Sequence, residues 1–383
     1  MRILVVHNQL WAHYKSKLFE EIYRNLLARY PSAVFKVAQI SLYESARASM
    51  QPSDAALYEY PYEVLFRKSL DQITLLQRVR ALFRAYNDFK PTVLNITGYY
   101  DWAQVLLMCY AKLKGTRIVL SSESSALDHQ RNPVKETIKK WIVNRADAYF
   151  CFGTTSVAYL KLLGVPENKI SVRHGAVIDD ERVKQTFMEA RRQNPVPQSN
   201  FIFVGRFSPE KNLMTLLRVY AKIRAGRPDS WGLLLVGDGP ERKQLESYAN
   251  REIGDSVVFS GGISWQDVPK WLAKAGALVL PSTSEPWGLV VNEALVCGLP
   301  VVVSDQCGCV EDLVHDGGNG YIFSPLDSDR LEACMLRLMD ASDDTTALFS
   351  QNGRNLVNKF ASGKVAGEMV TTFAELGSHT DKK

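Results

Sequence analysis

The chain has 383 residues, of which 46% are hydrophobic and 23% charged, and its formal net charge is +5. That length exceeds one ordinary hydrophobic core and predicts two domains. Its six cysteines are too few and too scattered for a disulfide framework, and no apolar run approaches the ~18 residues of a membrane-spanning helix. We therefore expect a globular, cytoplasmic protein with reduced thiols.

Positive charge is concentrated in the first half of the chain. Residues 1–190 carry 26 Lys and Arg against 18 Asp and Glu, whereas residues 191–383 carry 20 against 23. A solvated helix face explains such clusters, and so does contact with an anionic membrane surface or a phosphorylated acceptor. Nucleic acid is not expected as a partner, because no stacking platform accompanies the charge. The basic residues that cluster are Arg67, Lys68, Arg78, Arg80 and Arg84, and then Lys135, Lys139, Lys140 and Arg145 around Ile138, Trp141 and Ile142.

Predicted strands alternate with predicted helices in the first half. Short runs of Val, Ile and Leu are typical of buried parallel strands, and apolar residues repeating every three to four positions are typical of helices. Residues 41–65 are Tyr-rich and are predicted to be irregular. The strands are predicted at 2–7, 34–40, 93–96, 117–120, 148–152 and 170–173, and the helices at 17–30, 70–89, 102–114, 133–145 and 154–163.

The same alternation restarts after a polar, Pro-bearing segment at residues 191–200, which is predicted to be a linker. Strands separated by helices imply parallel, doubly wound sheets. The strands are predicted at 201–204, 232–236, 257–260, 277–280 and 301–304, and the helices at 213–224, up to 251, at 266–274, from 288 onward, and at 328–340, 345–361 and 363–376.

These elements predict an α/β fold with two Rossmann-like, doubly wound domains that face each other across a cleft. Ligands of such folds bind at the carboxyl ends of the strands. The segments are an N-terminal, acceptor-binding domain at 1–190, the linker at 191–200, a C-terminal, donor-binding domain at 201–361, a terminal helix at 362–377 that crosses back onto the N-terminal domain, and a disordered tail at 378–383.

One stretch of the second half places two carboxylates around a helix start. Glu285 lies in the predicted loop after the strand at 277–280, and Glu293 lies in the second turn of the helix that Gly288 opens, off its core-facing side. Between them, the free amides of Gly288, Leu289 and Val290 offer a seat for a phosphate. Such a pair is most often solvated surface, but carboxylates for hydroxyls beside amides for a diphosphate suit a nucleotide sugar.

A second strand, glycine turn and helix occur upstream. Gly205 ends the strand at 201–204, and Arg206 and Lys211 follow it. Two cations at this position could neutralise a diphosphate, which strengthens the prediction of a nucleotide-sugar site.

The second half resembles glycosyltransferase family 4, retaining enzymes of the GT-B fold. Four pieces in order carry the resemblance: Val204-Gly205-Arg206-Phe207 with Glu210-Lys211-Asn212, then Leu235-Val236-Gly237-Asp238-Gly239-Pro240-Glu241, then Pro281-Ser282 with Glu285-Pro286-Trp287-Gly288-Leu289 and Glu293-Ala294, then Gly298-Leu299-Pro300. A glycine-rich turn alone is a weak signal, whereas four ordered pieces with paired glutamates are specific.

The resemblance implies a role for each matching residue. Arg206 and Lys211 would grip the diphosphate together with the glycine turns at Gly205 and Gly239, and would stabilise the charge on the leaving nucleotide. Glu285 would hold hydroxyls of the transferred sugar, supported by the amides of Trp287, Gly288 and Leu289. Backbone near Ile263 would meet the base, and Glu293 would bind the ribose.

The first half departs from the family pattern. Many relatives carry a Gly-Gly turn after the first strand, whereas this chain has Lys15 nearby, which is our candidate for a phosphate or acceptor contact. Glu123, at the carboxyl end of a predicted strand, is the candidate for a sugar or acceptor contact. A carboxylate that caps its own loop is an equally good interpretation of Glu123.

No metal or cofactor is expected, because the chain has no DxD motif in a plausible loop and its six histidines lack ligand spacing. We thus expect a retaining glycosyltransferase that uses a nucleotide-diphosphate sugar and a glycan, lipid-linked or surface-polysaccharide acceptor. It would act in the cytoplasm or on the cytoplasmic face of a membrane, in polysaccharide biosynthesis. The alternatives are a GT-B-type nucleotide-sugar epimerase and a non-catalytic nucleotide-sugar-binding protein.

Overall fold

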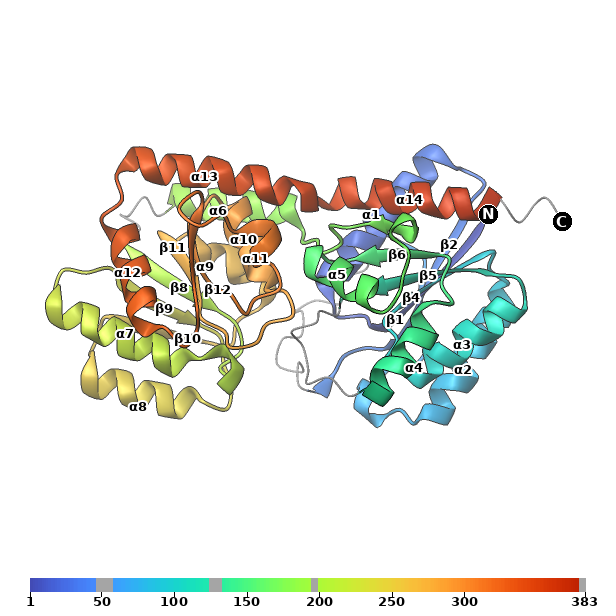
Figure 1. The fold of residues 1–383 in the computed structure, drawn as a ribbon, viewed down its shortest axis with the longest axis horizontal. Coiled ribbons are helices and arrows are strands. Elements are labelled where there is room, and N and C mark those ends of the chain that lie inside the picture. Colours follow the sequence, from blue (N-terminus) through green and yellow to red (C-terminus); the bar gives the residue numbers. More distant parts are fainter. Residues whose placement is uncertain (46–57, 124–132, 194–198, 379–383) are drawn as a thin grey trace. The chain divides into compact units, whose positions relative to one another are not determined.

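The computed structural model describes residues 1–45, 58–123, 133–193 and 199–378, and the chain forms two compact units (Figure 1). The first unit comprises Met1–Ile178 and Phe360–Lys383, and the second comprises Asp179–Lys359. The two segments of the first unit are therefore far apart in the sequence.

The first unit is built on a seven-stranded sheet whose paired strands are all parallel, in the order β3-β2-β1-β4-β5-β6-β7. Its central strands are rich in Val, Ile and Leu and almost wholly buried, as a sheet covered on both faces requires. The strands are β1 (Arg2–Gln9), β2 (Val34–Ser41), β3 (Tyr62–Val64), β4 (Val93–Thr97), β5 (Arg117–Ser122), β6 (Ala148–Cys151) and β7 (Ile170–Val172).

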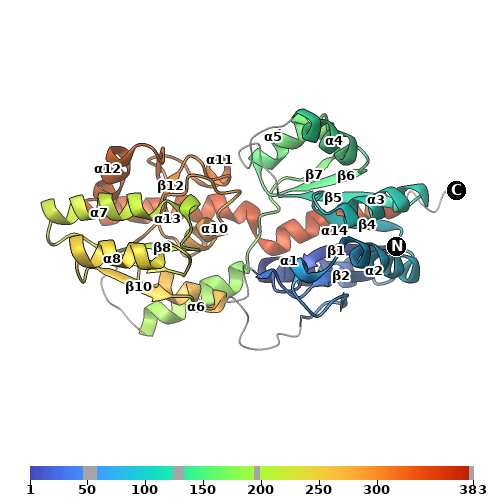
Figure 2. The ribbon, with the colours of Figure 1, turned by 90° about the horizontal axis from the view of Figure 1, so that it is seen from below.

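Helices cover both faces of this sheet. One face packs on α1 (His13–Arg29) and on the C-terminal helix α14 (Ser362–Ser378), which run side by side in Figures 1 and 2. The other face forms a second core with the remaining helices, namely α2 (Leu75–Phe89), α3 (Trp102–Leu113), α4 (Pro133–Val143) and α5 (Thr154–Leu162).

The second unit has a six-stranded parallel sheet in the order β10-β9-β8-β11-β12-β13. Its strands are β8 (Asn200–Val204), β9 (Gly232–Val236), β10 (Val257–Gly261), β11 (Ala277–Leu280), β12 (Val301–Ser304) and β13 (Gly320–Phe323). Its helices are α6 (Asp180–Gln193), α7 (Leu213–Gly226), α8 (Arg242–Glu252), α9 (Val268–Leu272), α10 (Leu289–Val296), α11 (Val310–Leu313), α12 (Ser328–Met339) and α13 (Asp343–Val357).

The strand order reverses once in each sheet. In the first unit β1 lies between β2 and β4, and in the second β8 lies between β9 and β11. Loops at the carboxyl ends of the two strands that flank such a reversal diverge to opposite faces, and this is where doubly wound sheets bind ligands. The segments after β1, β8 and β11 are those that the sequence predicted to carry Lys15, Arg206 with Lys211, and Glu285.

The prediction of two Rossmann-like, doubly wound α/β domains is confirmed. Some boundaries were wrong. Helix α1 begins at His13 rather than at residue 17, which places Lys15 in its first turn, and the stretch expected to be irregular contributes the edge strand β3. In place of the helix expected at 70–89 there is a 3-10 turn, Leu70–Gln72, followed by α2. Thr74 is the N-cap residue of α2.

The boundary between the units also differs from the expected one. Residues 179–190 belong to the second unit, because α6 packs on α9 and α10 there. Residues 191–193 end α6 and residue 200 starts β8, so these positions are not linker, and residues 194–198 lie outside the described part of the chain. The terminal helix α14 lies in the first unit, and of the expected disordered tail only Ser378 is described, as the end of α14. Among the described residues, no helix is long and apolar enough to cross a membrane.

We predict that Phe373→Ala destabilises the first unit by about 3–5 kcal/mol, because a fully buried ring would be lost from α14. The Phe373 ring packs edge-on against Phe150 of β6, with 5.5 Å between centroids. Hydrogen exchange measured peptide by peptide should show lost protection in the first unit's sheet and none in the second unit's. The exposed Glu375→Ala is the control, and equal protection in both variants would contradict the prediction.

Candidate functional site

The loops after β8 and β9 lie so close that they require glycine. The Gly205 amide donates to Val236 O at 3.0 Å, and the Phe207 amide donates to Asp238 O at 2.9 Å. A Cβ on Gly237 would overlap Gly205 O, and a Cβ on Gly239 would overlap the backbone of Phe207. The glycines thus let the two loops bond to each other directly, and they hold the segment that carries Arg206.

A second set of contacts ties the β8–α7 segment to the loop after β11. The Lys211 ammonium forms an ion pair with the Glu285 carboxylate, and both side chains are about 15% exposed. The Thr283 amide donates to Glu210 O at 2.8 Å, and Asn212 Nδ2 donates to Pro281 O at 3.2 Å. Asn212 has a φ of 56°, a left-handed conformation that asparagine tolerates, so the chain can turn from the 3-10 segment into α7.

The Glu285 loop is also fixed from its other side. The Glu285 amide donates to Gln306 O at 3.2 Å, and Gly308 and Cys309 donate to the carbonyls of Glu285 and Trp287. These bonds extend the pairing of β11 and β12 beyond the strands themselves. The role of the segment 306–309 was not predicted, although its Cys-Gly-Cys sequence marks it; both thiols are buried and free.

Gly288 is the N-cap residue of helix α10. Gly288 has a φ of +96°, and a Cβ there would press on Leu280, so glycine is required. The Val291 amide turns back to Gly288 O, and no described side chain caps the helix. The amides of Leu289 and Val290 lie in the first turn of this helix, where the positive end of the helix dipole favours an anion.

The Trp287 side chain is part of the packed interior of the second unit. It is 3% exposed, and its indole Nε1 donates to Asn292 Oδ1 at 2.8 Å. Only the backbone of Trp287 can therefore serve a ligand, as the sequence prediction proposed. Ile263 is half-buried in the loop after β10, at the same edge of the sheet.

Glu293 is more enclosed than the sequence suggested. It was expected well off the core-facing side of its helix, but α10 packs against α6 and α13 as well as against the sheet, so few of its positions face water. Burial raises the pKa of the Glu293 carboxyl to about 8. The side chain is thus mostly protonated at neutral pH in the unliganded protein.

The second unit therefore gathers most of the predicted donor-site residues on loops that bond to one another. The exposed Arg206 and the half-buried Lys211 supply positive charge, Glu285 supplies negative charge, and the start of α10 supplies amides. This arrangement can bind an anionic group next to a polyhydroxy group.

In the first unit the structure brings together Lys15 and Glu123. Lys15 is 4% exposed, and its ammonium lies 2.6 Å from Glu123 Oε1 and 4.4 Å from the centroid of the Phe152 ring. Glu123 thus pairs with a lysine from another element, whereas the alternative was a carboxylate that caps its own loop. A small cavity beside Lys15 has room for about one water molecule. Most of its lining is apolar, including Phe19, Phe150 and Phe152, and the polar side chains of Asn95, Thr97 and Ser121 complete it.

Sequence reasoning missed a buried hydrogen-bonded chain beneath Lys15. His7 Nδ1 lies 2.9 Å from Gln39 Oε1, Gln39 Nε2 donates to Tyr60 OH, and Tyr60 OH donates to Ser16 Oγ. Burial, and then the positive charge of Lys15, lowers the pKa of His7 to about 4, so His7 is neutral here. Polar residues at alternate positions of the first two strands were the available signal.

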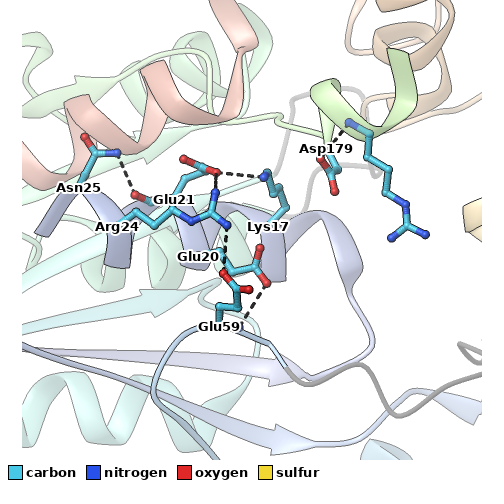
Figure 3. A network of polar contacts seen from close by, with 8 residues as sticks. Lys17, Glu20, Glu21, Arg24, Asn25, Glu59 and Asp179 are labelled. Carbon is cyan, nitrogen blue, oxygen red and sulfur yellow. Dashed lines mark hydrogen bonds and ion pairs between the residues drawn. The ribbon is translucent and has the colours of Figure 1, made fainter. Parts of the chain in front are cut away.

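A network of ion pairs joins side chains of α1 to Glu59 (Figure 3). Arg24 pairs with Glu21 at 3.0 Å and with Glu59 at 3.1 Å, and Lys17 pairs with Glu21 at 3.0 Å. Ion pairs as exposed as those of Arg24 contribute little free energy, and we assign this network no binding role. No group of three or more His, Cys, Asp or Glu in the described ranges could hold a metal ion.

Two parallel, doubly wound units with these loops define the fold of the GT-B glycosyltransferases. Residues 185–356 match the family described as "Glycosyl transferases group 1". The match covers most of the second unit and less than half of the chain, and it agrees with the resemblance that the sequence indicated.

Two curated relatives are similar to the same part of the chain, and one solved structure shares the fold of the whole chain. The chain is 31% identical over 184 residues to the sulfoquinovosyl transferase SQD2 of Arabidopsis thaliana, covering 47% of this chain and 32% of the relative. It is 28% identical over 198 residues to the 2-deoxystreptamine glucosyltransferase of Streptomyces kanamyceticus, covering 49% and 50%. The chain thus spans half or less of the length of these curated relatives. The crystal structure of Anabaena Alr3699/HepE in complex with UDP has a TM-score of 0.74 and 19% identity, covers 98% of this chain and 100% of its own, and shares the fold.

We predict that Glu293→Gln stabilises the unliganded second unit, and increasingly so as pH rises. The unfolded carboxyl ionises near its ordinary pKa of 4.5 and the folded one near 8, so the parent loses stability between these two values as pH rises. Glutamine does not titrate, so its advantage should be on the order of 2–4 kcal/mol larger at about pH 9 than at about pH 5. Urea unfolding at both pH values measures it, with the exposed Glu311→Gln as control, and a pH-independent difference would contradict the prediction.

Proposed function

We propose that the protein is a retaining, metal-independent glycosyltransferase of the family 4 type, which moves a sugar from a nucleotide-diphosphate sugar to a glycan, lipid-linked or surface-polysaccharide acceptor. One observation carries the proposal. Lys211 and Glu285 pair on loops that follow β8 and β11, the two strands at the reversal of the second sheet. A cation for phosphate and a carboxylate for hydroxyls thus lie together where such sheets bind ligands.

The diphosphate of the donor would bind between Arg206, Lys211 and the first amides of α10. These groups are held by backbone bonds between loops, so they need little reorganisation when charge develops on the leaving group. Glu285 would accept hydrogen bonds from hydroxyls of the transferred sugar with the carboxylate oxygen that Lys211 leaves available. Of the relatives, the Anabaena protein carries UDP in its crystal structure, which supports a nucleoside diphosphate as the bound group.

The remaining donor contacts follow from the same edge of the sheet. Backbone near Ile263 would meet the base, and Glu293 would bind the ribose. Because the pKa of Glu293 is raised to about 8, its carboxyl would meet the ribose mainly in the neutral form at pH 7, with one oxygen accepting and the hydroxyl donating.

In the transfer step the bond between the sugar's anomeric carbon and the phosphate oxygen breaks, and a bond to the acceptor oxygen forms on the same face. The acceptor's proton passes to the leaving phosphate, so the step needs no carboxylate base. Glu285 and Glu293 then act as binding groups, unlike the acid and base pair of glycoside hydrolases.

The acceptor is assigned to the first unit. Lys15 would contact a phosphate or the acceptor itself, and Glu123 would contact the acceptor or the sugar. We place the reaction in the cytoplasm or on the cytoplasmic face of a membrane, where the excess of basic residues in the first half would meet anionic lipids.

We predict that Lys211→Ala lowers kcat by about 10²–10³, because one fixed cation at the leaving group is lost. Glu285→Gln should lower kcat/KM comparably, since the amide keeps the shape but loses the acceptor charge. Release of nucleoside diphosphate from a panel of donors is the measurement.

Lys222→Ala and Glu332→Gln are matched controls, since these residues form an ion pair in the same unit, 2.6 Å apart, away from the proposed site. Unchanged turnover in both site variants, or equal losses in the controls, would refute the assigned roles.

Two features of the mechanism are tested together. The anomeric configuration of the product, read by NMR on the first formed glycoside, should equal that of the donor. Turnover after chelation of divalent ions should equal turnover before it. Inversion would overturn same-face attack, and loss of activity that is restored by a metal would overturn metal independence.

The same assays separate the alternatives. An epimerase would return a nucleotide sugar with altered stereochemistry and would release no nucleoside diphosphate to an acceptor. A non-catalytic binding protein would be stabilised by a donor without turning it over.

A further inference from the structure

Helix α4 turns an apolar stripe to the outside of the first unit. Val134, Ile138 and Trp141 are 68%, 41% and 51% exposed. They stand four and then three positions apart, so they lie on one side of the helix. The next two residues, Ile142 and Val143, are 3% and 0% exposed and pack into the core, so the exposed stripe is in addition to the face that holds the helix in place.

Basic side chains flank this stripe. Lys135 and Lys140 are exposed on α4. The Arg145 guanidinium lies 3.2 Å from the centroid of the Trp141 ring. It therefore places a positive charge at the C-terminal end of the stripe. Lys139 is different, because its ammonium turns inward to Glu136 Oε1 at 2.8 Å and to Tyr159 OH at 2.7 Å.

Two further aromatic residues stand next to the stripe. Tyr100 and Trp102, at the start of α3, are 55% and 52% exposed. The Lys139 ammonium lies 5.7 Å from the centroid of the Tyr100 ring, which places the start of α3 beside the middle of α4. Figure 2 shows α4 on the outer side of the first unit, away from α14. We call this surface the α4 face, and it comprises Tyr100, Trp102, Val134, Lys135, Ile138, Lys140, Trp141 and Arg145.

We infer that the α4 face docks the first unit on a bilayer surface that contains anionic lipids. Trp and Tyr prefer the boundary between headgroups and acyl chains, and a helix with an apolar stripe and lysine flanks lies in that plane. Val134, Ile138 and Trp141 would enter the headgroup layer while Lys135, Lys140 and Arg145 meet lipid phosphates. The sequence had placed Ile142 on such a face, but it belongs to the core, and Val134 takes its place.

The position of α4 in the fold connects this surface to the acceptor. In a parallel α/β unit the helix after a strand starts near that strand's carboxyl end, so α4 starts on the side of the sheet where β5 ends. Glu123 follows β5 directly and pairs with Lys15. If the proposed function holds, docking brings an acceptor carried by a lipid to that edge, whereas docking itself does not depend on the transfer reaction.

Co-sedimentation with vesicles tests the inference on the full chain. The parent should bind vesicles of phosphatidylglycerol mixed with phosphatidylcholine at low salt. It should bind them several-fold less at ~1 M salt, and it should bind phosphatidylcholine alone weakly. The double variant Ile138→Asp with Trp141→Asp should lower binding about tenfold, because two inserted side chains become charged. Leu348→Asp in α13, 57% exposed in the second unit, is the matched control and should bind as the parent does.

A second variant, Lys135→Glu with Lys140→Glu, changes only exposed charges and keeps the test valid if the first variant unfolds, which its thermal midpoint reveals. It should abolish the preference for anionic vesicles. Parental binding in both variants, or no binding of the parent at either salt concentration, would overturn the inference. Sedimentation velocity tests whether a second copy of the chain occupies this surface instead. If the parent forms dimers that the α4 variants abolish, and does not bind vesicles, the α4 face is an interface between copies and the inference is overturned. Donor turnover in solution is unaffected by any of these outcomes, so a failure here leaves the proposed transfer reaction standing.

Discussion

The candidate donor site depends on how closely four loops of the second unit approach one another. Backbone bonds join the loop after β8 to the loop after β9, and join the loop after β11 to both the β8–α7 segment and residues 306–309. The first of these contacts exists because Gly237 and Gly239 have no Cβ, and the helix start at Gly288 needs a left-handed φ. The backbone segments that carry Lys211 and Glu285 are therefore fixed by hydrogen bonds between loops, and the two side chains pair with each other. This suits groups that must be in place before a reaction begins.

The two units each contain a Lys–Glu ion pair at the strand-order reversal, but the groups around the two pairs differ. Each places a lysine after the central strand where the strand order reverses, and each pairs that lysine with a glutamate from beyond another strand: Lys15 with Glu123, and Lys211 with Glu285. The second unit surrounds its pair with backbone amides, which favour an anion. The first surrounds its pair with Phe152 and a neutral polar chain from His7 to Ser16, which favours an uncharged group. This division agrees with a phosphate-bearing donor in one unit and an acceptor in the other.

Much of the fold could be read from the sequence, because strands buried on both faces are continuous runs of Val, Ile and Leu, and helices between them have a clear period. The donor motifs were found for the same reason, since glycine turns and paired glutamates at fixed spacing leave a visible pattern. The sequence predictions that were wrong or missing concern features that depend on packing between elements far apart in the sequence. The enclosure of Glu293 comes from α6 and α13, and α6 joins the second unit through contacts that no local pattern announces. The Lys15–Glu123 pair joins residues more than a hundred positions apart, so spacing could not reveal it.

The C-terminal helix has a consequence for how the chain is made. Because α14 supplies Val365, Met369 and Phe373 to the core beside β1 and β6, the first unit lacks part of its interior until residues 362–378 have left the ribosome. The second unit needs none of that segment, so it can close earlier although it is translated later. Premature termination within α14 would thus leave the second unit intact and the first unit with an uncovered apolar sheet, a state open to aggregation and to removal by proteases.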